Sequence, residues 1–600
     1  IAPRIRCPSD GPILRLSSLE GRFAVDRIVL GIFDGPSGGA ALVREGRLLG
    51  TAEEDRLLRR HRVSGLPRAS VQSVLARCGV LGETVSAVVI ATRNATYSEG
   101  AGEAARPPLL YRMGTAVPSP AVVGRRIRDT YARDRRRRID EALRSEFGIS
   151  CPVAFLDHHR IHALSAAALT GSRDCLVITM DSGADGAWLQ VTSLRNGGTE
   201  TLHQQSHSRS LLSFLMYVSD ALGLGERVDR FERLTDLAAH GKATALDRLR
   251  PYISYPAGRI EPDEILYRRN GVVPELLAES RREDLAAAAL RLVGEAAGRL
   301  AAHWLTESGH ERLVLGGDLF DLLPVVDAVR RTPGLGGALV PMAPGDAGLP
   351  VGCAFAGSLE EVLIDPFNLP EQPLVSPFVG LSFPDDEIEE ALLWEGIPFR
   401  HEPDAEVHLA RALAEGRTLV RFSGATEIGN RGLGNRALLR SPRGELRRGR
   451  VGFLVKPGSY HALVQEGAFG EWFEENGLDP SCFRTAPGLA APRARFREEC
   501  PDLAGWDGRV AVQTVSASAT PELHRILTEF EAWTGMPVLA AAPFRLPDEP
   551  LVSSPRDALR TFRLLGADLA ALGPFLVTNP DVTAAAPAAP AAASRNEVRR

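Results

Sequence analysis

The chain has 600 residues, of which 44% are hydrophobic and 24% charged, an ordinary composition for a globular protein of about two to four domains. The formal charge of −5 is small for this length, which argues against nucleic acid or an anionic membrane as a main partner. The 7 cysteines include no Cys-x-x-Cys pair, and no apolar run approaches the roughly 20 residues that cross a bilayer. We therefore expect a cytoplasmic α/β protein with reduced thiols and a small-molecule site.

After an expected N-terminal extension, residues 1–26, the chain shows an internal repeat. Each copy predicts three antiparallel strands joined by Gly-containing turns, with an acidic residue, Asp34 or Asp181, at the end of the first strand. Such a repeat is typical of duplicated actin-like ATPase domains, in which the paired turns face each other across a cleft, with the carboxylate near a metal. The strands are expected at 27–35, 38–43 and 47–50, and again at 175–183, 186–191 and about 199–202.

An arginine-rich stretch, residues 125–138, lies between the two copies and has the spacing of a helix. We interpret its arginines as a solvated or domain-contacting helix face, with an anionic partner as the alternative.

A candidate metal site follows, where residues 155–167 predict a short strand running into a helix. His158 and His162 are four residues apart and therefore lie on one face, where they can ligate one ion. Asp181, at a predicted strand end, could supply a carboxylate. Two histidines and one carboxylate with open positions suit Fe(II) or another divalent ion, although a His-x-x-x-His alone is often structural.

The pair Gly316-Gly317 separates a predicted strand, 313–317, from a predicted helix, 319–330. The missing side chains would let a ligand approach the backbone, but a plain tight turn explains them equally well. Beyond this point the composition predicts a Pro-rich linker at 358–376, a second α/β domain at 377–580 and a disordered tail at 581–600.

Seven different motifs follow one another in a specific order across residues 27–577. In the first domain they are Gly31-Ile32 with the turn at 37–43, the charged stretch 53–60, His158-His159-x-x-His162-Ala163 and the Gly-Asp-Ala-Gly run at 345–352; in the second they are 424–439, 512–515 and 549–552. In this order they resemble the O-carbamoyltransferases of nodulation-factor and antibiotic biosynthesis, the family that includes the cephamycin and tobramycin carbamoyltransferases.

The resemblance implies an actin-like first domain (27–357), similar to tRNA-threonylcarbamoylation enzymes, and a YrdC-like second domain. The second domain would make carbamoyl-adenylate from carbamoyl phosphate and ATP with Mg²⁺, and the first would pass the carbamoyl group to a hydroxyl of an antibiotic-type small molecule. The implied metal ligands are His158, His162, Asp181 and Asp346, of which the first three are the implied catalytic residues. The implied nucleotide-binding residues are Gly316, Gly317, Asp321, Arg431, Arg436 and Lys456.

The sequence also departs from the family pattern. Asp34 stands where the family has a histidine that can serve as acid or base, and Asp321 replaces an asparagine. The runs 231–238, 457–461 and 540–545 have lost family side chains, many of them polar. Three hypotheses follow: an active O-carbamoyltransferase, a non-catalytic partner or scaffold of an intact homologue, and a metal-dependent enzyme with another donor. A homo-dimer and a hetero-complex with a homologous subunit are both open.

Overall fold

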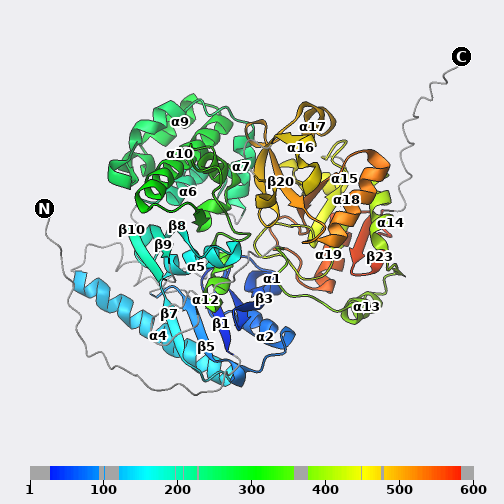
Figure 1. Cartoon of the computed structure of the whole chain (residues 1–600), viewed down its shortest axis with the longest axis horizontal. Helices are drawn as coiled ribbons and strands as arrows, with labels where there is room; N and C mark the ends of the chain where they lie inside the picture. The colour runs from blue at the N-terminus through cyan, green and yellow to red at the C-terminus, as the bar shows by residue number, and fades with distance from the viewer. Residues whose placement is uncertain are drawn as a thin grey trace, which may run out of the picture.

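The structure is a computed structural model with two α/β bodies, drawn in Figure 1 in blue to green for residues up to 356 and in yellow-green to red from residue 376 onward. The expected N-terminal extension, nearly all of the expected linker and the tail beyond residue 582 lie outside the described residues. No described helix is long and apolar enough to cross a membrane. The described residues are 27–93, 100–101, 121–195, 198–206, 209–225, 229–356, 376–446, 449–474 and 479–582.

The first body contains two sheets with the same plan, in the orders β3-β2-β1-β5-β7 and β10-β9-β8-β13. In each sheet three consecutive strands pair antiparallel, and a later strand joins the first of them in parallel. The α/β class and the internal repeat are therefore confirmed. The strands are β1 Ile28–Phe33, β2 Gly39–Arg44, β3 Arg47–Glu53, β5 Ala87–Ala91, β7 Val153–Leu156, β8 Cys175–Ala184, β9 Ala187–Arg195, β10 Gly198–Ser206 and β13 Leu313–Gly316. Strand β10 extends past its predicted end because its pairing with β9 continues.

A pair of helices, α5 (His158–Thr170) and α12 (Leu349–Phe355), packs together between the two sheets. Small residues make this packing close. A Cβ on Gly31 of β1 would lie 2.1 Å from the carbonyl oxygen of Pro350, and a Cβ on Gly352 would lie 2.5 Å from that of Ile161. The glycines of two family-like motifs thus fix the distance between α5, α12 and the first sheet, and α5 carries both candidate histidines.

The outer helices bury the remaining faces of these sheets. Helix α10 (Arg282–Ser308) packs with α6 (Leu211–Ala221), α7 (Arg230–Ala239) and α11 (Leu323–Arg330) over the second sheet, and α4 (Ala121–Phe147) runs along the outside of the first (Figure 1). The helix predicted at 319–330 is in fact a 3-10 turn, Asp318–Asp321, followed by α11. A proline in the first turn of α11 accounts for this start, because proline suits that position and disfavours a longer upstream helix.

The second body is one twisted sheet of ten strands, in the order β14-β23-β22-β15-β16-β21-β17-β20-β19-β18. Helices α13 (Asp385–Trp394), α14 (Ala405–Ala414), α18 (Pro521–Thr534) and α19 (Pro555–Leu565) pack around it. The strands are β14 Arg400–His401, β15 Leu419–Phe422, β16 Arg436–Arg440, β17 His461–Gln465, β18 Phe473–Glu474, β19 Gly488–Pro492, β20 Val510–Val515, β21 Val538–Pro543, β22 Leu569–Leu572 and β23 Phe575–Thr578. The alanines at 540–542 belong to β21 and are fully buried.

Candidate metal centre and active site

Helix α5 begins directly after strand β7, and this junction positions the two histidines. Asp157 caps the helix by accepting a hydrogen bond from the backbone N–H of Arg160, as expected for an aspartate at that position. His158 and His162 then project from one face of α5 toward strand β8, and both side chains are buried. The predicted strand-to-helix junction is confirmed.

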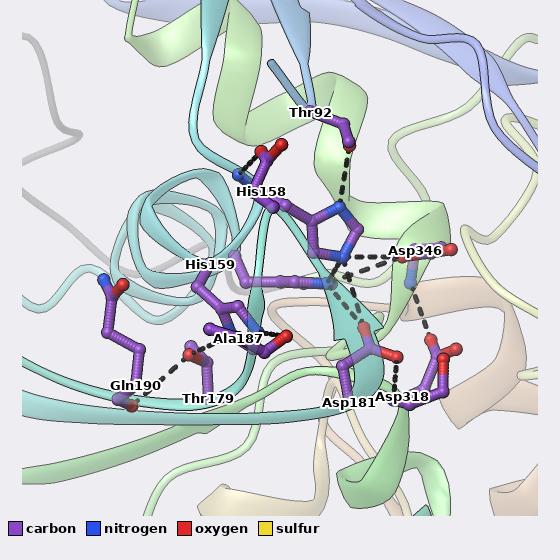
Figure 2. Close-up of polar contacts among 12 residues, drawn as sticks. Thr92, His158, His159, Thr179, Asp181, Ala187, Gln190, Asp318 and Asp346 are labelled. Atoms are coloured by element: carbon purple, nitrogen blue, oxygen red, sulfur yellow. Dashed lines mark hydrogen bonds and ion pairs between the residues drawn. The ribbon is translucent and has the colours of Figure 1, made fainter. Parts of the chain in front are cut away.

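Four side chains from three elements converge at one point (Figure 2). The Nε2 atoms of His158 and His162 lie 3.0 Å apart. Asp181 Oδ2, from β8, lies 3.2 and 3.3 Å from these nitrogens, and Asp346 Oδ1, just before α12, lies 3.5 and 3.4 Å from them. The four ligand atoms all lie within 4.8 Å of one another. The structure thus brings together the four residues predicted as metal ligands.

These separations fit a divalent metal ion. Bonds of about 2.1 Å to nitrogen and oxygen place neighbouring ligand atoms about 3.0–3.4 Å apart at angles between 90° and tetrahedral. The two nitrogens and the two carboxylate oxygens point into one small space, where a single cation can interact with all four ligand atoms at once. Two nitrogens with two carboxylate oxygens form a donor set suited to Fe(II), Zn(II) or a similar ion.

The charges of the cluster are strongly coupled. Burial disfavours the charged form of His162, yet the carboxylates of Asp181 and Asp346 raise its pKa to about 10. Burial likewise opposes the charge of Asp181, but the two histidines hold the pKa of its carboxyl well below the ordinary value. Asp318 accepts a hydrogen bond from the backbone N–H of Asp346 at 3.0 Å, and burial with the neighbouring carboxylates raises its pKa. The centre therefore favours cations.

A chain of contacts behind His158 fixes the orientation of its ring. Thr92, directly after β5, lies with its Oγ1 2.9 Å from His158 Nδ1, which leaves Nε2 facing the cluster (Figure 2). The backbone of Thr92 has a φ of 71°, unusual for a β-branched residue, and its carbonyl accepts a hydrogen bond of 2.7 Å from Arg135. Arg135 in turn forms a buried ion pair with Asp34.

These contacts correct two expectations. The Asp34 carboxylate does not reach the metal cluster as the generic turn pattern suggested, because the Arg135 guanidinium binds both of its oxygens. Nor do all arginines of the α4 stretch lie on the surface. Arg135 is 5% exposed and supports Thr92, whereas Arg137 and Arg138 are exposed and pair with acidic residues of the same helix.

His159, between the two ligands in sequence, does not join the cluster. Its Nδ1 lies 2.8 Å from Thr179 Oγ1 and its Nε2 lies 3.2 Å from the carbonyl of Ala187 (Figure 2). Burial, with the charge of His158, lowers its pKa to about 3. It is therefore a neutral structural histidine.

A cavity of about 1300 Å³ opens in front of the cluster and reaches the second body. His158, Asp181 and Asp346 line it from the first body, whereas His162 lies behind them and is fully buried. From the second body it is lined by Arg431 and Lys456.

The other predicted nucleotide-binding residues divide into two groups. Asp321 lines the cavity. Burial raises the pKa of its carboxyl to about 6, although the charge of Arg431 opposes the rise. Gly316 and Gly317 do not line it but pack against α5 and β8, where a Cβ on Gly317 would lie 2.2 Å from the carbonyl oxygen of Met180. Arg436 also lies away from the cavity, with its guanidinium bonded to the carbonyls of Ser423, Gly424 and Asn435.

Comparison with known proteins supports the predicted resemblance. Residues 410–579 match the family model described as carbamoyltransferase C-terminus. The second body thus carries a carbamoyltransferase C-terminal domain. Nodulation protein NolNO of Sinorhizobium fredii is 26% identical over 90% of this chain and 78% of its own length. The 3'-hydroxymethylcephem-O-carbamoyltransferase of Amycolatopsis lactamdurans is 32% identical over 27% of this chain and 30% of its own.

Two solved structures each cover 55% of this chain. The activator of the 2-hydroxyisocaproyl-CoA dehydratase from Clostridium difficile, with bound ADPNP, is 13% identical with a TM-score of 0.31 over 92% of that chain. A ROK family glucokinase from Streptomyces griseus, in complex with glucose and AMPPNP, is 14% identical with a TM-score of 0.26 over 98% of that chain. Scores this low carry no argument, and the duplicated fold rests on the strand order.

Sequence reasoning missed Thr92, Asp318 and the pairing of Asp34 with Arg135. The positions of Thr92 and Asp318 in the sequence could have revealed them. Thr92 directly follows the parallel strand β5, and Asp318 comes two residues after the parallel strand β13. The carboxyl ends of parallel strands face the ligand site in α/β folds. Arg135 had none, because its neighbours in the helix are also arginines.

Proposed function

We propose that the chain moves a carbamoyl group from carbamoyl phosphate, by way of carbamoyl-adenylate, to a hydroxyl of a small natural-product acceptor. One observation carries this proposal: a single cavity joins the His158–Asp346 cluster of the first body to the cationic residues Arg431 and Lys456 of the second. A reaction that needs both an electrophile-activating centre and an anion-binding wall finds both in one cavity.

The two bodies would divide the work. We assign residues 27–357 to an actin-like transferase domain and residues 377–580 to a YrdC-like, adenylate-forming domain that uses ATP with Mg²⁺. Arg431 and Lys456 would bind phosphate oxygens of ATP and of the adenylate, Arg431 through its fork of N–H groups and Lys456 as a point charge.

His158, His162, Asp181 and Asp346 would hold a divalent ion, with Fe(II) as our first choice. When bound, it would act as a Lewis acid toward the carbamoyl carbonyl. In the transfer step a bond forms between the acceptor oxygen and the carbamoyl carbon, the bond from that carbon to the phosphate oxygen breaks, and AMP leaves as the hydroxyl proton is released.

A second candidate keeps the metal centre but uses a different donor. Asp318 and Asp321 place two more acidic side chains beside the cluster, and in their ionised form they repel phosphate. Pro543, which lines the cavity, also offers no backbone N–H to a phosphate.

The test uses the full chain with ATP and carbamoyl phosphate. We expect pyrophosphate release that requires both substrates, together with about one divalent ion per chain by elemental analysis. The His158→Ala variant should lose the metal and keep pyrophosphate release, whereas Lys456→Met should lose release and keep the metal. Bound metal without release favours the second candidate, and absence of both signals overturns the proposal in favour of a non-catalytic partner.

A further inference from the structure

The charged stretch at 53–60, to which the proposed reaction assigns no role, makes a buried contact between the two bodies. Helix α1 (Glu54–Leu58) follows β3, and the side chains of Glu53 and Arg56 reach across to residues 426–429 of the second body. The two side chains also pair with each other at 3.1 Å. Arg56 is buried, at 4% exposed, and the Glu53 side chain is 11% exposed.

The Glu53–Arg56 pair binds both the backbone N–H and the backbone carbonyl of Gly429. The N–H of Gly429 donates to Glu53 Oε1 at 2.8 Å, and its carbonyl accepts from Arg56 Nη2. Arg56 Nη1 donates to the carbonyl of Glu427 at 2.6 Å and to Thr426 Oγ1 at 2.9 Å. Burial raises the pKa of Glu53, and Arg56 opposes that rise, so the two charges depend on each other.

The segment fixed in this way leads directly into the cavity. Gly429, Arg431 and Gly432 all line it, and Arg431 Nη2 donates to the backbone carbonyl of Asp321 at 2.6 Å. The far end of the segment is anchored in the second body, where the buried carboxylate of Glu427 accepts from the N–H groups of Leu433 and Arg436. A short loop therefore has its entry fixed by one body and its exit by the other.

We propose that the Glu53–Arg56 pair is a positioning device that sets the place of Arg431 in the cavity. This inference rests on the proposed function, in which Arg431 binds the anionic donor. Because a guanidinium recognises phosphate through a directed fork, a shift of its loop weakens binding even though the charge is retained. Arg56 does not line the cavity and acts through Arg431, whereas Glu53 lines it beside Gly429.

A simpler explanation is that the Glu53–Arg56 pair only stabilises the interface between the two bodies. The chain offers a control for this explanation. Arg77 also pairs across the two bodies, with Glu387 at 2.6 and 2.7 Å, but neither residue lines the cavity. If Arg56 only fastened the bodies, Arg77→Gln and Arg56→Lys would have similar effects.

The experiment measures ATP binding by titration calorimetry on the full chain. We expect Arg431→Gln and Arg56→Lys each to weaken ATP binding by at least about tenfold, because each loses a charge-assisted contact or its geometry. The double variant should bind no more than about twofold more weakly than Arg431→Gln, since residues acting through one contact are not additive. Arg77→Gln should bind as the wild type does. Glu53→Gln keeps an acceptor for the N–H of Gly429, so it should lose less ATP affinity than Arg56→Lys. It replaces Arg56→Lys in the experiment if that variant does not fold.

Three outcomes overturn the inference. Additive losses in the double variant would show that Arg56 acts independently of Arg431. Equal losses of ATP affinity in Arg56→Lys and Arg77→Gln would show that the Glu53–Arg56 pair only stabilises the interface between the bodies. Wild-type protein that fails to bind ATP would overturn the proposed function as well, which separates that failure from the other two.

Discussion

Replacing Thr92 by valine tests whether the residues behind His158 control the metal centre. Valine keeps the shape of threonine and removes the 2.9 Å contact with His158 Nδ1. The ring then loses the partner that fixes its orientation, and a buried N–H loses its acceptor, which costs about 1–3 kcal/mol. Loss of such an outer partner commonly weakens metal binding by about 10- to 100-fold, or about 1.4–2.7 kcal/mol. We expect a loss in that range.

The assay is competition between the metal-free protein and a chromophoric chelator, with Zn²⁺ and, without oxygen, Fe²⁺. Thr179→Val is the matched control, because Thr179 makes the equivalent contact of 2.8 Å with the structural His159. It should lower the free energy of unfolding by about 1–3 kcal/mol and leave metal affinity within about twofold. Equal metal affinity in Thr92→Val and the wild type would refute the reasoning, and so would equal losses in both variants.

Three further predictions concern buried charges. Arg135→Met leaves the Asp34 carboxylate buried without its ion pair and should lower the free energy of unfolding in urea by about 3–5 kcal/mol, against less than about 1 kcal/mol for Arg248→Gln, whose pairs are exposed. Arg436→Met should lower stability by about 2–4 kcal/mol but leave the ATP affinity of the folded protein unchanged, and a calorimetric loss of affinity would contradict its position away from the cavity. Burial raises the pKa of Asp236 from 3.8 to about 6, so its carboxylate destabilises the folded state increasingly as the pH rises from about 4 to 6. Asp236→Asn should be more stable than the wild type by about 1–2 kcal/mol at pH 8, and chemical unfolding should show the difference falling as the pH is lowered and vanishing toward about pH 3.5. A difference independent of pH would show that another effect is at work.

The repeat and the metal cluster could be predicted because local sequence determines them. Glycine-containing turns mark the ends of short strands, and the spacing of His158 and His162 places them on one helix face whatever surrounds them. Asp346 came only from the resemblance, since nothing local links a loop before α12 to a histidine 188 positions earlier. The four-residue cluster therefore combines a local signal with a non-local one.

The roles of individual arginines could not be predicted, because tertiary packing alone decides them. Arg431 and Arg436 are five residues apart in one motif, and the sequence gives no reason to prefer either of them as a phosphate ligand. The structure places the first at the cavity wall and stacks the second on the ring of Phe422, 3.7 Å from its centroid. In α4, Arg135 turns inward while its arginine neighbours remain at the surface. Periodicity gives the helix but does not identify which of several like residues meets a buried acceptor.

The departures from the family pattern have a consistent electrostatic meaning. Asp34, in place of a histidine, is neutralised by Arg135 and supports the metal centre from behind. Asp318 and Asp321 are two further acidic side chains beside a centre that already holds two carboxylates, and a bound cation would favour their charged forms. Such a centre attracts a divalent cation and repels a free phosphate, so we expect the anionic part of a donor to bind at the wall that carries Arg431 and Lys456. That wall belongs to the second body, which is why the position of its loop relative to the first body matters for catalysis.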